Sequence, residues 1–315
     1  MLQCERFRRE LLVHCYRMSG SLDDAEDLVQ ETMTRAWRAQ ERYDEGRASI
    51  RTWLYAIASN VCLTDLAGRG RRPLPAGIGQ PSDDPDAPLV PAADIGWLQP
   101  LPDLRDGIVD PAGISERRGS LRLAFVAAVQ LLPPRQRAVL ILRDVLAFTA
   151  AEVAEVLETT PAAVNSALQR AKSSLRQANL REGDMPYRAG DPKANAMIAR
   201  YVTAFEAADV DALVHLLADD VILEMPPVPL WFRGPVDYGR FIARVFVMRG
   251  TDWRMLVTSA NTQPALAAYY RDAVGRYLPH SVQVFDVGAG GIERTTVFVD
   301  SSVFRSFDLP LHIEA

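Results

Sequence analysis

One short segment near the middle of the chain groups amides, hydroxyls and cations on one face, with no acid among them. Within residues 161–176 these side chains recur at helical spacing: Asn165, Ser166, Gln169, Arg170, Lys172, Ser173 and Arg176. Amides and guanidinium groups can pair with base edges, and cations can bind phosphates. The pattern indicates DNA contact. The alternative is a pair of packed helices with a solvated polar face.

The residues around this face predict a helix-turn-helix over 149–176. Thr149 and Glu152 have the spacing of a capping box, and Glu158 with Thr159 occupies the turn. Thr160 caps the second helix, whose first position is Pro161. Apolar side chains recur on the opposite side of that helix and should face inward: Val164, Leu168, Ala171 and Leu175.

Charge is unevenly distributed along the chain. The net charge of all 315 residues is −5, whereas residues 117–181 hold 10 bases and 4 acids. Residues 73–116 hold 1 base and 8 acids. A basic module beside an acidic segment is typical of local phosphate contact, and the basic excess coincides with the predicted helix-turn-helix.

Composition narrows the remaining function classes. The hydrophobic fraction of 48% is enough for real cores. No apolar run is long enough for a membrane span, so we expect a cytoplasmic protein without a membrane partner. The three cysteines form no C-x-x-C pair and the four histidines show no metal-ligand spacing. We therefore expect buried thiols, no metal and no cofactor.

Two breaks divide the chain into predicted modules at 1–70, 117–180 and 193–315. Residues 71–116 contain nine of the 21 prolines and should form an extended, mobile linker. A second break lies near 181–193. In the first module the sequence predicts helices over Arg6–Met18, Ser21–Gln40 and Arg51–Arg69, with a polar loop at 41–50.

The last module places helices before strands. The pattern predicts a helix, a turn near Asp209 and a shorter helix over 193–217, then a strand and a proline-rich loop at Pro226–Pro229. A further helix and four strands follow at Gly234–Val247, Trp253–Ala260, Ala265–Tyr270, Val282–Val287 and Ile292–Val299. This order indicates an α+β cone.

Two motifs resemble a known family. DAEDLVQETMTRAWR at 24–38 and RTWLYAIASNVCLTDL at 51–66 are similar to region 2 of the sigma-70 family of bacterial sigma factors. LPPRQRAVLILRDVL at 132–146, running into the helix-turn-helix, is similar to region 4. The spacing matches the extracytoplasmic-function group. One departure is Ala147–Phe148, where relatives often have Gly-Trp.

The resemblance implies partners and site residues. Core RNA polymerase would bind through its largest-subunit clamp and its flap, the clamp at an acidic helix comprising Asp24, Glu26, Asp27, Gln30 and Glu31. The −10 promoter element would be melted and read by Tyr43, Arg47, Ser49, Trp53, Tyr55, Asn60, Arg69, Arg71 and Arg72. The −35 element would be read by Pro161, Ala162, Asn165, Ser166, Gln169, Arg170, Lys172, Ser173 and Arg176. For Trp53, core packing is the stronger alternative.

The segments ADDVILEMPP and WFRGPVDYGRFI resemble the SnoaL-like domain of the nuclear transport factor 2-like superfamily. The fold class is then multi-domain, with two all-α sigma domains and a C-terminal α+β cone. Such a cone can hold a pocket for a small ligand, with candidate lining residues Tyr201, His215, Trp231, Tyr238, Trp253, Asn261, Gln263 and Tyr269.

The main hypothesis is an alternative sigma factor regulated in cis by its C-terminal domain, through contact with the other modules or by sensing a ligand. Two alternative functions remain open. One is a helix-turn-helix regulator that acts without polymerase. The other is a fused enzyme in which His215 or Asp219 acts on a small substrate; fold alone does not establish such chemistry.

Overall fold

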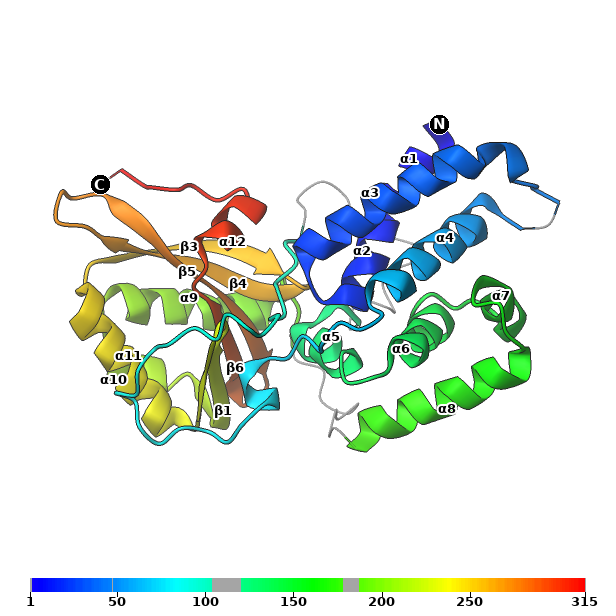
Figure 1. Cartoon of the computed structure of the whole chain (residues 1–315). Coiled ribbons are helices and arrows are strands. Elements are labelled where there is room, and N and C mark those ends of the chain that lie inside the picture. The colour runs from blue at the N-terminus through cyan, green and yellow to red at the C-terminus, as the bar shows by residue number, and fades with distance from the viewer. Residues whose placement is uncertain (1, 47, 104–119, 178–186, 315) are drawn as a thin grey trace. The chain divides into compact units, whose positions relative to one another are not determined.

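The computed structural model describes residues 2–46, 48–103, 120–177 and 187–314, and the chain forms two compact units (Figure 1). The first unit, called the sigma unit after the family that its sequence resembles, comprises Met1–Arg72 and Leu104–Arg181. The second, the cone unit, comprises Pro73–Asp103 and Glu182–Ala315. This division differs from the predicted one, because residues 73–103 belong with the C-terminal domain instead of forming a separate linker.

The first half of the sigma unit is a bundle of helices: α1 (Leu2–Glu5), α2 (Arg8–Ser19), α3 (Leu22–Ala39), η1 (Gln40–Arg42) and α4 (Ile50–Asp65). Helix α2 ends at Gly20, whose φ of 73° is readily adopted by glycine. Ser21 and Ser49 cap α3 and α4 by accepting hydrogen bonds from backbone N–H groups. Helix α4 ends at Asp65, before the predicted end at Arg69.

The second half contains α5 (Leu123–Val129), α6 (Pro134–Leu140), η4 (Ile141–Val145), α7 (Ala150–Val156) and α8 (Pro161–Gln177). The predicted capping box is confirmed: Thr149 Oγ1 accepts from the Glu152 backbone N–H at 3.2 Å, and Glu152 Oε2 accepts from that of Thr149 at 2.7 Å. Thr160 Oγ1 caps α8 by accepting from Ala163 N at 3.2 Å. The helix-turn-helix therefore forms where its capping residues predict it.

A six-stranded sheet forms the centre of the cone unit, in the order β2-β1-β6-β5-β4-β3. Its strands are β1 (Leu217–Met225), β2 (Val228–Arg233), β3 (Trp253–Ala260), β4 (Gln263–Arg271), β5 (Tyr277–Gly288) and β6 (Gly291–Phe298). Only the β1–β6 pair is parallel among these neighbours. Strand β2 begins inside the predicted proline-rich loop, and α12 (Ser301–Ser306) was not predicted.

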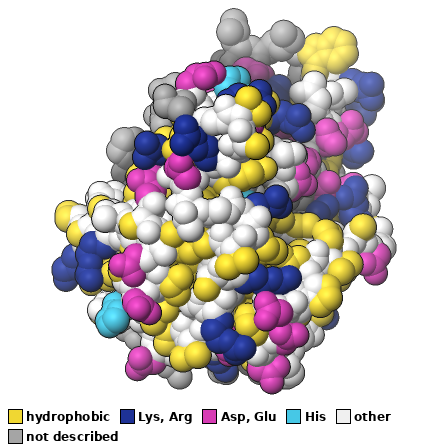
Figure 2. Space-filling view, turned by 90° about the vertical axis from the view of Figure 1, so that its left-hand side faces the viewer, with side chains coloured by type: hydrophobic (Ala, Val, Ile, Leu, Met, Phe, Trp, Pro, Cys, Tyr) yellow, Lys and Arg dark blue, Asp and Glu magenta, His cyan; other side chains and the backbone are white. Residues whose placement is uncertain are grey.

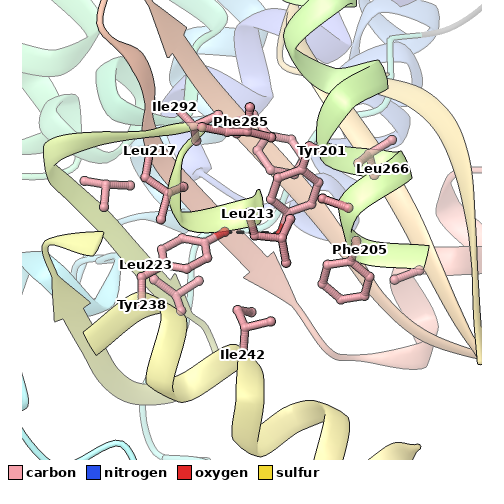
Figure 3. Close-up of a cluster of buried hydrophobic side chains, with 14 of the residues drawn as sticks. Tyr201, Phe205, Leu213, Leu217, Leu223, Tyr238, Ile242, Leu266, Phe285 and Ile292 are labelled. Carbon is pink, nitrogen blue, oxygen red and sulfur yellow. Dashed lines mark hydrogen bonds between the residues drawn. The ribbon is translucent and has the colours of Figure 1, made fainter. Parts of the chain in front are cut away.

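Helices α9 (Pro192–Glu206), α10 (Val210–Val214) and α11 (Pro235–Arg249) pack against one face of the sheet. Aromatic side chains fill the space between the layers, including Tyr201 and Phe205 from α9, Tyr238 from α11 and Phe285 from β5 (Figure 3). Large rings that interlock with strand side chains form a packed core here, as expected for an α+β cone.

The surface on the α11 side mixes apolar and charged groups. In Figure 2, hydrophobic side chains lie between clusters of basic and acidic ones on this face. Helix α11 contributes three exposed apolar side chains, Val236, Val247 and Met248. Apolar surface is common on folded domains, so this mixture does not by itself identify a binding site.

Residues 73–103, called the strap from here on, follow the surface of the cone unit, where Figure 1 draws them in cyan. Trp231 Nε1 donates to Gly79 O at 3.1 Å, and Ser82 N donates back to Trp231 O at 2.8 Å. Near the other end, Leu101 and Asn261 exchange two hydrogen bonds of 2.8 Å. The strap is thus anchored along its length, which corrects the expectation of a mobile linker for these residues; residues 104–116 of that linker lie outside the described ranges.

Candidate functional site

Helix α8 presents the predicted −35 face to solvent. All nine predicted residues of this helix are exposed: Pro161, Ala162, Asn165, Ser166, Gln169, Arg170, Lys172, Ser173 and Arg176. On the opposite side Val164 and Ala171 are fully buried, while Leu168 and Leu175 are half-buried against α5 and α6. The apolar stripe thus anchors the helix and leaves its amides and cations facing outward.

One cation of this face has a partner within the protein. Lys172 Nζ lies 2.7 Å from Asp144 Oδ2 in the π-helical segment η4, and both side chains are more than a third exposed. An exposed ion pair of this kind is weak, because water and salt screen it. Lys172 can therefore exchange Asp144 for a phosphate at little cost.

The predicted polymerase surface lies along α3. Glu26, Asp27 and Gln30 are exposed, whereas Asp24 and Glu31 are partly buried. A groove of about 330 Å³ runs beside them, lined by Asp24, Asp27, Leu28, Glu31, Arg35, Val61, Thr64, Asp65 and Arg69. Its acidic walls would suit a cationic partner.

Two arginines reach into this acidic surface from the chain beyond α4. Arg69 Nη1 lies 2.8 Å and Arg72 Nη2 lies 2.6 Å from the same oxygen, Asp24 Oδ2. Both arginines are among the residues predicted to read the −10 element. In this structure they pair with an acid of the predicted polymerase surface.

The remaining predicted −10 residues lie in the loop before α4 and on that helix. The rings of Tyr43 and Trp53 are 5.0 Å apart, and Trp53 is half-buried. Ser49, Asn60 and Arg71 are exposed. Arg47 falls outside the described residues.

Tyr55 has a different environment from the other predicted −10 residues. It is 1% exposed, and its hydroxyl donates to Glu10 Oε2 at 3.2 Å. Its ring lies 5.5 Å from that of Phe148, and the Arg51 guanidinium covers it at 4.9 Å. Burial and the neighbouring Glu10 raise its pKa. The ring is therefore packed into the sigma unit instead of being open to a base.

Arg137 joins the two halves of the sigma unit, a role that sequence reasoning missed. Its Nη1 donates to Met18 O at the end of α2 and to Gln130 Oε1 at 2.6 Å. Its Nη2 donates to Gln130 O at 3.1 Å and Leu132 O at 3.2 Å. Burial lowers the pKa of Arg137 to about 10, which leaves it charged at neutral pH. Arg137 lies in the segment LPPRQR. A basic residue in a basic segment suggests DNA contact more readily than a role in joining two parts of the fold.

The eight predicted pocket residues lie in several different environments. Tyr201, Tyr238 and Trp253 belong to the core beneath the helices, where the Tyr201 and Tyr238 hydroxyls are 3.2 Å apart (Figure 3). Trp231 and Asn261 hold the strap. The others are Gln263, which donates to Asp286 Oδ1 at 3.0 Å, Tyr269, which donates to Pro310 O at 2.9 Å, and exposed His215.

A buried charged group lies under the start of the strap. Glu224 is fully buried, and its Oε1 accepts from Arg294 Nη1 at 2.6 Å and from Thr296 Oγ1 at 3.2 Å. Its Oε2 accepts from Ala76 N in the strap at 3.0 Å. Burial disfavours the charge of Arg294, yet Glu224 and Asp286 raise its pKa above the ordinary value. The strap thus supplies a hydrogen bond that a buried carboxylate requires.

Within the described ranges, no three side chains of His, Cys, Asp or Glu type gather so as to hold a metal ion. In the same ranges no helix combines the length and apolar character needed to cross a membrane.

Comparison with solved structures supports the fold. The crystal structure of the Mycobacterium tuberculosis extracytoplasmic function sigma factor SigJ matches with a TM-score of 0.65 and 24% identity. The match covers 98% of this chain and 99% of that one. Helical domains and a C-terminal α+β domain are therefore the fold of this chain, as predicted.

Comparison with sequences identifies the family. The models for sigma-70 region 2, sigma-70 region 4 and the SnoaL-like domain match residues 4–72, 122–175 and 198–295. The ECF RNA polymerase sigma factor SigG of M. tuberculosis is 48% identical, over 97% of this chain and 82% of its own length. SigJ of the same organism is 31% identical over 69% of this chain and 62% of its own. The chain belongs to the extracytoplasmic-function group of the sigma-70 family, with sigma regions 2 and 4 followed by a SnoaL-like domain.

Proposed function

We propose that this sigma factor binds core RNA polymerase and directs it to a subset of promoters, with α8 reading the −35 element. The observation that carries the proposal is the exposed, acid-free face of α8 on a capped helix-turn-helix. The N-terminal part of such a helix enters the major groove. Asn165, Gln169 and Arg170 are then placed for base edges, and Lys172 for a phosphate.

The polymerase contact would be made by the acidic face of α3. Its support is the clustering of carboxylates around the groove between α3 and α4. Opposite charges across an interface speed association and fix its register. The partner would be the clamp of the polymerase largest subunit, as in the family that the chain belongs to.

Reading of the −10 element would use the loop before α4 together with exposed Asn60. The paired rings of Tyr43 and Trp53 offer a surface on which an unpaired base could stack. Tyr55 would become available only after Phe148 moves away from it, because the two rings are in contact. This part of the proposal therefore requires the halves of the sigma unit to separate on the promoter.

The test is transcription from a promoter pool by core polymerase with the full chain or with Arg170→Gln. Loss of a bidentate base contact costs about 1–3 kcal/mol and relaxes the sequence preference at one position. Arg200→Gln, at an exposed residue of α9, is the charge-matched control. If both variants gave the same start sites with the same efficiency, α8 would not be the −35 reader.

We further propose that the cone unit regulates the sigma unit in cis and does so without chemistry. The strap supports this proposal, because it leaves the sigma unit at Arg72, follows the cone unit through Asp103 and returns to the sigma unit. Any change that loosens the strap would alter how the two sigma regions are tethered. His215 and Asp219, the residues named for an enzymatic alternative, are both exposed at the end of α10 and on β1.

The regulatory proposal is tested by weakening the strap at one anchor. Asn261→Ala removes the acceptor of Leu101 N. We expect the promoter output of the full chain to change relative to wild type, in either direction. Unchanged output, together with protease accessibility showing that the strap has loosened, would exclude the strap as the regulatory element.

A further inference from the structure

Asp24 of α3 is held by two guanidinium groups at once. Arg69 and Arg72 both contact its Oδ2, at 2.8 and 2.6 Å, and Arg69 also pairs with Asp65 Oδ1 at 2.7 Å. The side chains of Asp24 and Arg72 are only 21% and 20% exposed. Partial burial reduces screening by salt, so this contact is stronger than an ordinary surface ion pair.

The same contact lies at the acidic groove between α3 and α4. Asp24, Asp65 and Arg69 all line that groove. A cationic partner entering it would meet an acid whose charge is already compensated by the chain's own arginines. The arginines and such a partner therefore compete for one carboxylate.

We propose that Arg69 and Arg72 form an internal latch on Asp24, which lowers the affinity of α3 for a cationic polymerase segment. The latch rests on the proposed function, since it regulates the surface assigned to polymerase.

The experiment compares the full-length protein with Arg72→Gln and Arg71→Gln in equilibrium binding to core polymerase without DNA. The two substitutions remove the same charge one residue apart, but Arg72 contacts Asp24 whereas Arg71 is exposed. We expect Arg72→Gln to bind about two- to fivefold more tightly than Arg71→Gln at low salt, with the difference shrinking at high salt. Arg200→Gln controls for the change in net charge.

Equal or weaker binding by Arg72→Gln would overturn the latch while leaving the sigma-factor proposal intact. Failure of the wild-type chain and of all variants to bind polymerase would instead refute both. A melting curve for each variant ensures that the comparison is made between folded proteins.

Discussion

Arg137→Ala should separate the two halves of the sigma unit. The guanidinium of Arg137 donates four hydrogen bonds, to Met18 O, Gln130 Oε1, Gln130 O and Leu132 O, and the residue is 4% exposed. Truncation leaves these acceptors without their donor in a region that water does not reach freely. It also removes the hydrogen bond from Arg137 in α6 to Met18 O at the end of α2.

The expected cost follows from these contacts. A hydrogen bond to a charged donor contributes roughly 1.5–3 kcal/mol, but the four are not additive, and removing a buried charge recovers part of its desolvation cost. We therefore expect a loss of about 3 kcal/mol in the free energy of unfolding of the sigma unit. Arg137→Lys should fall in between, because an ammonium keeps the charge but lacks the planar fork.

Urea unfolding followed by hydrogen exchange of α2 and α6 measures this effect. Arg135→Ala is the matched control: Arg135 lies in the same helix, is exposed, and has one recorded hydrogen bond of 3.5 Å, to Leu157 O. We expect that control to lose less than about 1 kcal/mol. If Arg137→Ala lowered the free energy of unfolding no more than Arg135→Ala, the conclusion that Arg137 holds the two halves of the sigma unit together would be wrong.

Three further predictions concern stability. Ala147 has a φ of 56°, so Ala147→Gly should relieve backbone strain and raise the unfolding free energy by about 1 kcal/mol in thermal melts; a lower melting temperature would contradict this. Burial, with Arg17 and Arg51 nearby, lowers the pKa of His14 to about 3, so the unfolded chain binds an extra proton below pH 6.5 and stability falls as the pH decreases. The loss should reach about 2 kcal/mol at pH 5 and shrink in His14→Gln but not in His312→Gln, as acid titrations of unfolding can check. Asn261→Ala should make the strap cleavable by protease at lower enzyme concentration than in wild type, and an unchanged cleavage pattern would argue against its anchoring role.

Local signals made the helix-turn-helix predictable. Capping residues act within three positions of themselves, so Thr149, Glu152 and Thr160 defined the helix starts without any tertiary information. Helical spacing likewise gave the inward positions Val164 and Ala171. The resemblance to sigma regions added the family, which the comparisons bear out.

The strap was not predictable because its anchors are long-range and largely use backbone groups. Arg244 and Trp231 donate to carbonyl oxygens, and every residue offers such an oxygen whatever its type. Proline and acid content indicated an extended chain correctly but could not indicate what the chain lies on. Composition describes local stiffness and solvation, whereas docking depends on a surface formed far away in the sequence.

The extent to which individual side chains are buried could not be predicted from the sequence either. Helical spacing placed Tyr55 on α4 but could not show that Phe148 covers its ring. Aromatic type likewise could not distinguish a pocket wall from a core, and Tyr201, Tyr238 and Trp253 belong to the core. Both cases depend on which elements meet in three dimensions, a property that residue spacing within one element does not encode.

The most direct test is capture of purified core RNA polymerase by the full-length protein, followed by run-off transcription from a genomic promoter pool. The account predicts a stable complex and new start sites that share one −35 and one −10 sequence. No complex and no new start sites, either with the wild-type chain or with the strap-loosening Arg244→Gln variant, would contradict it.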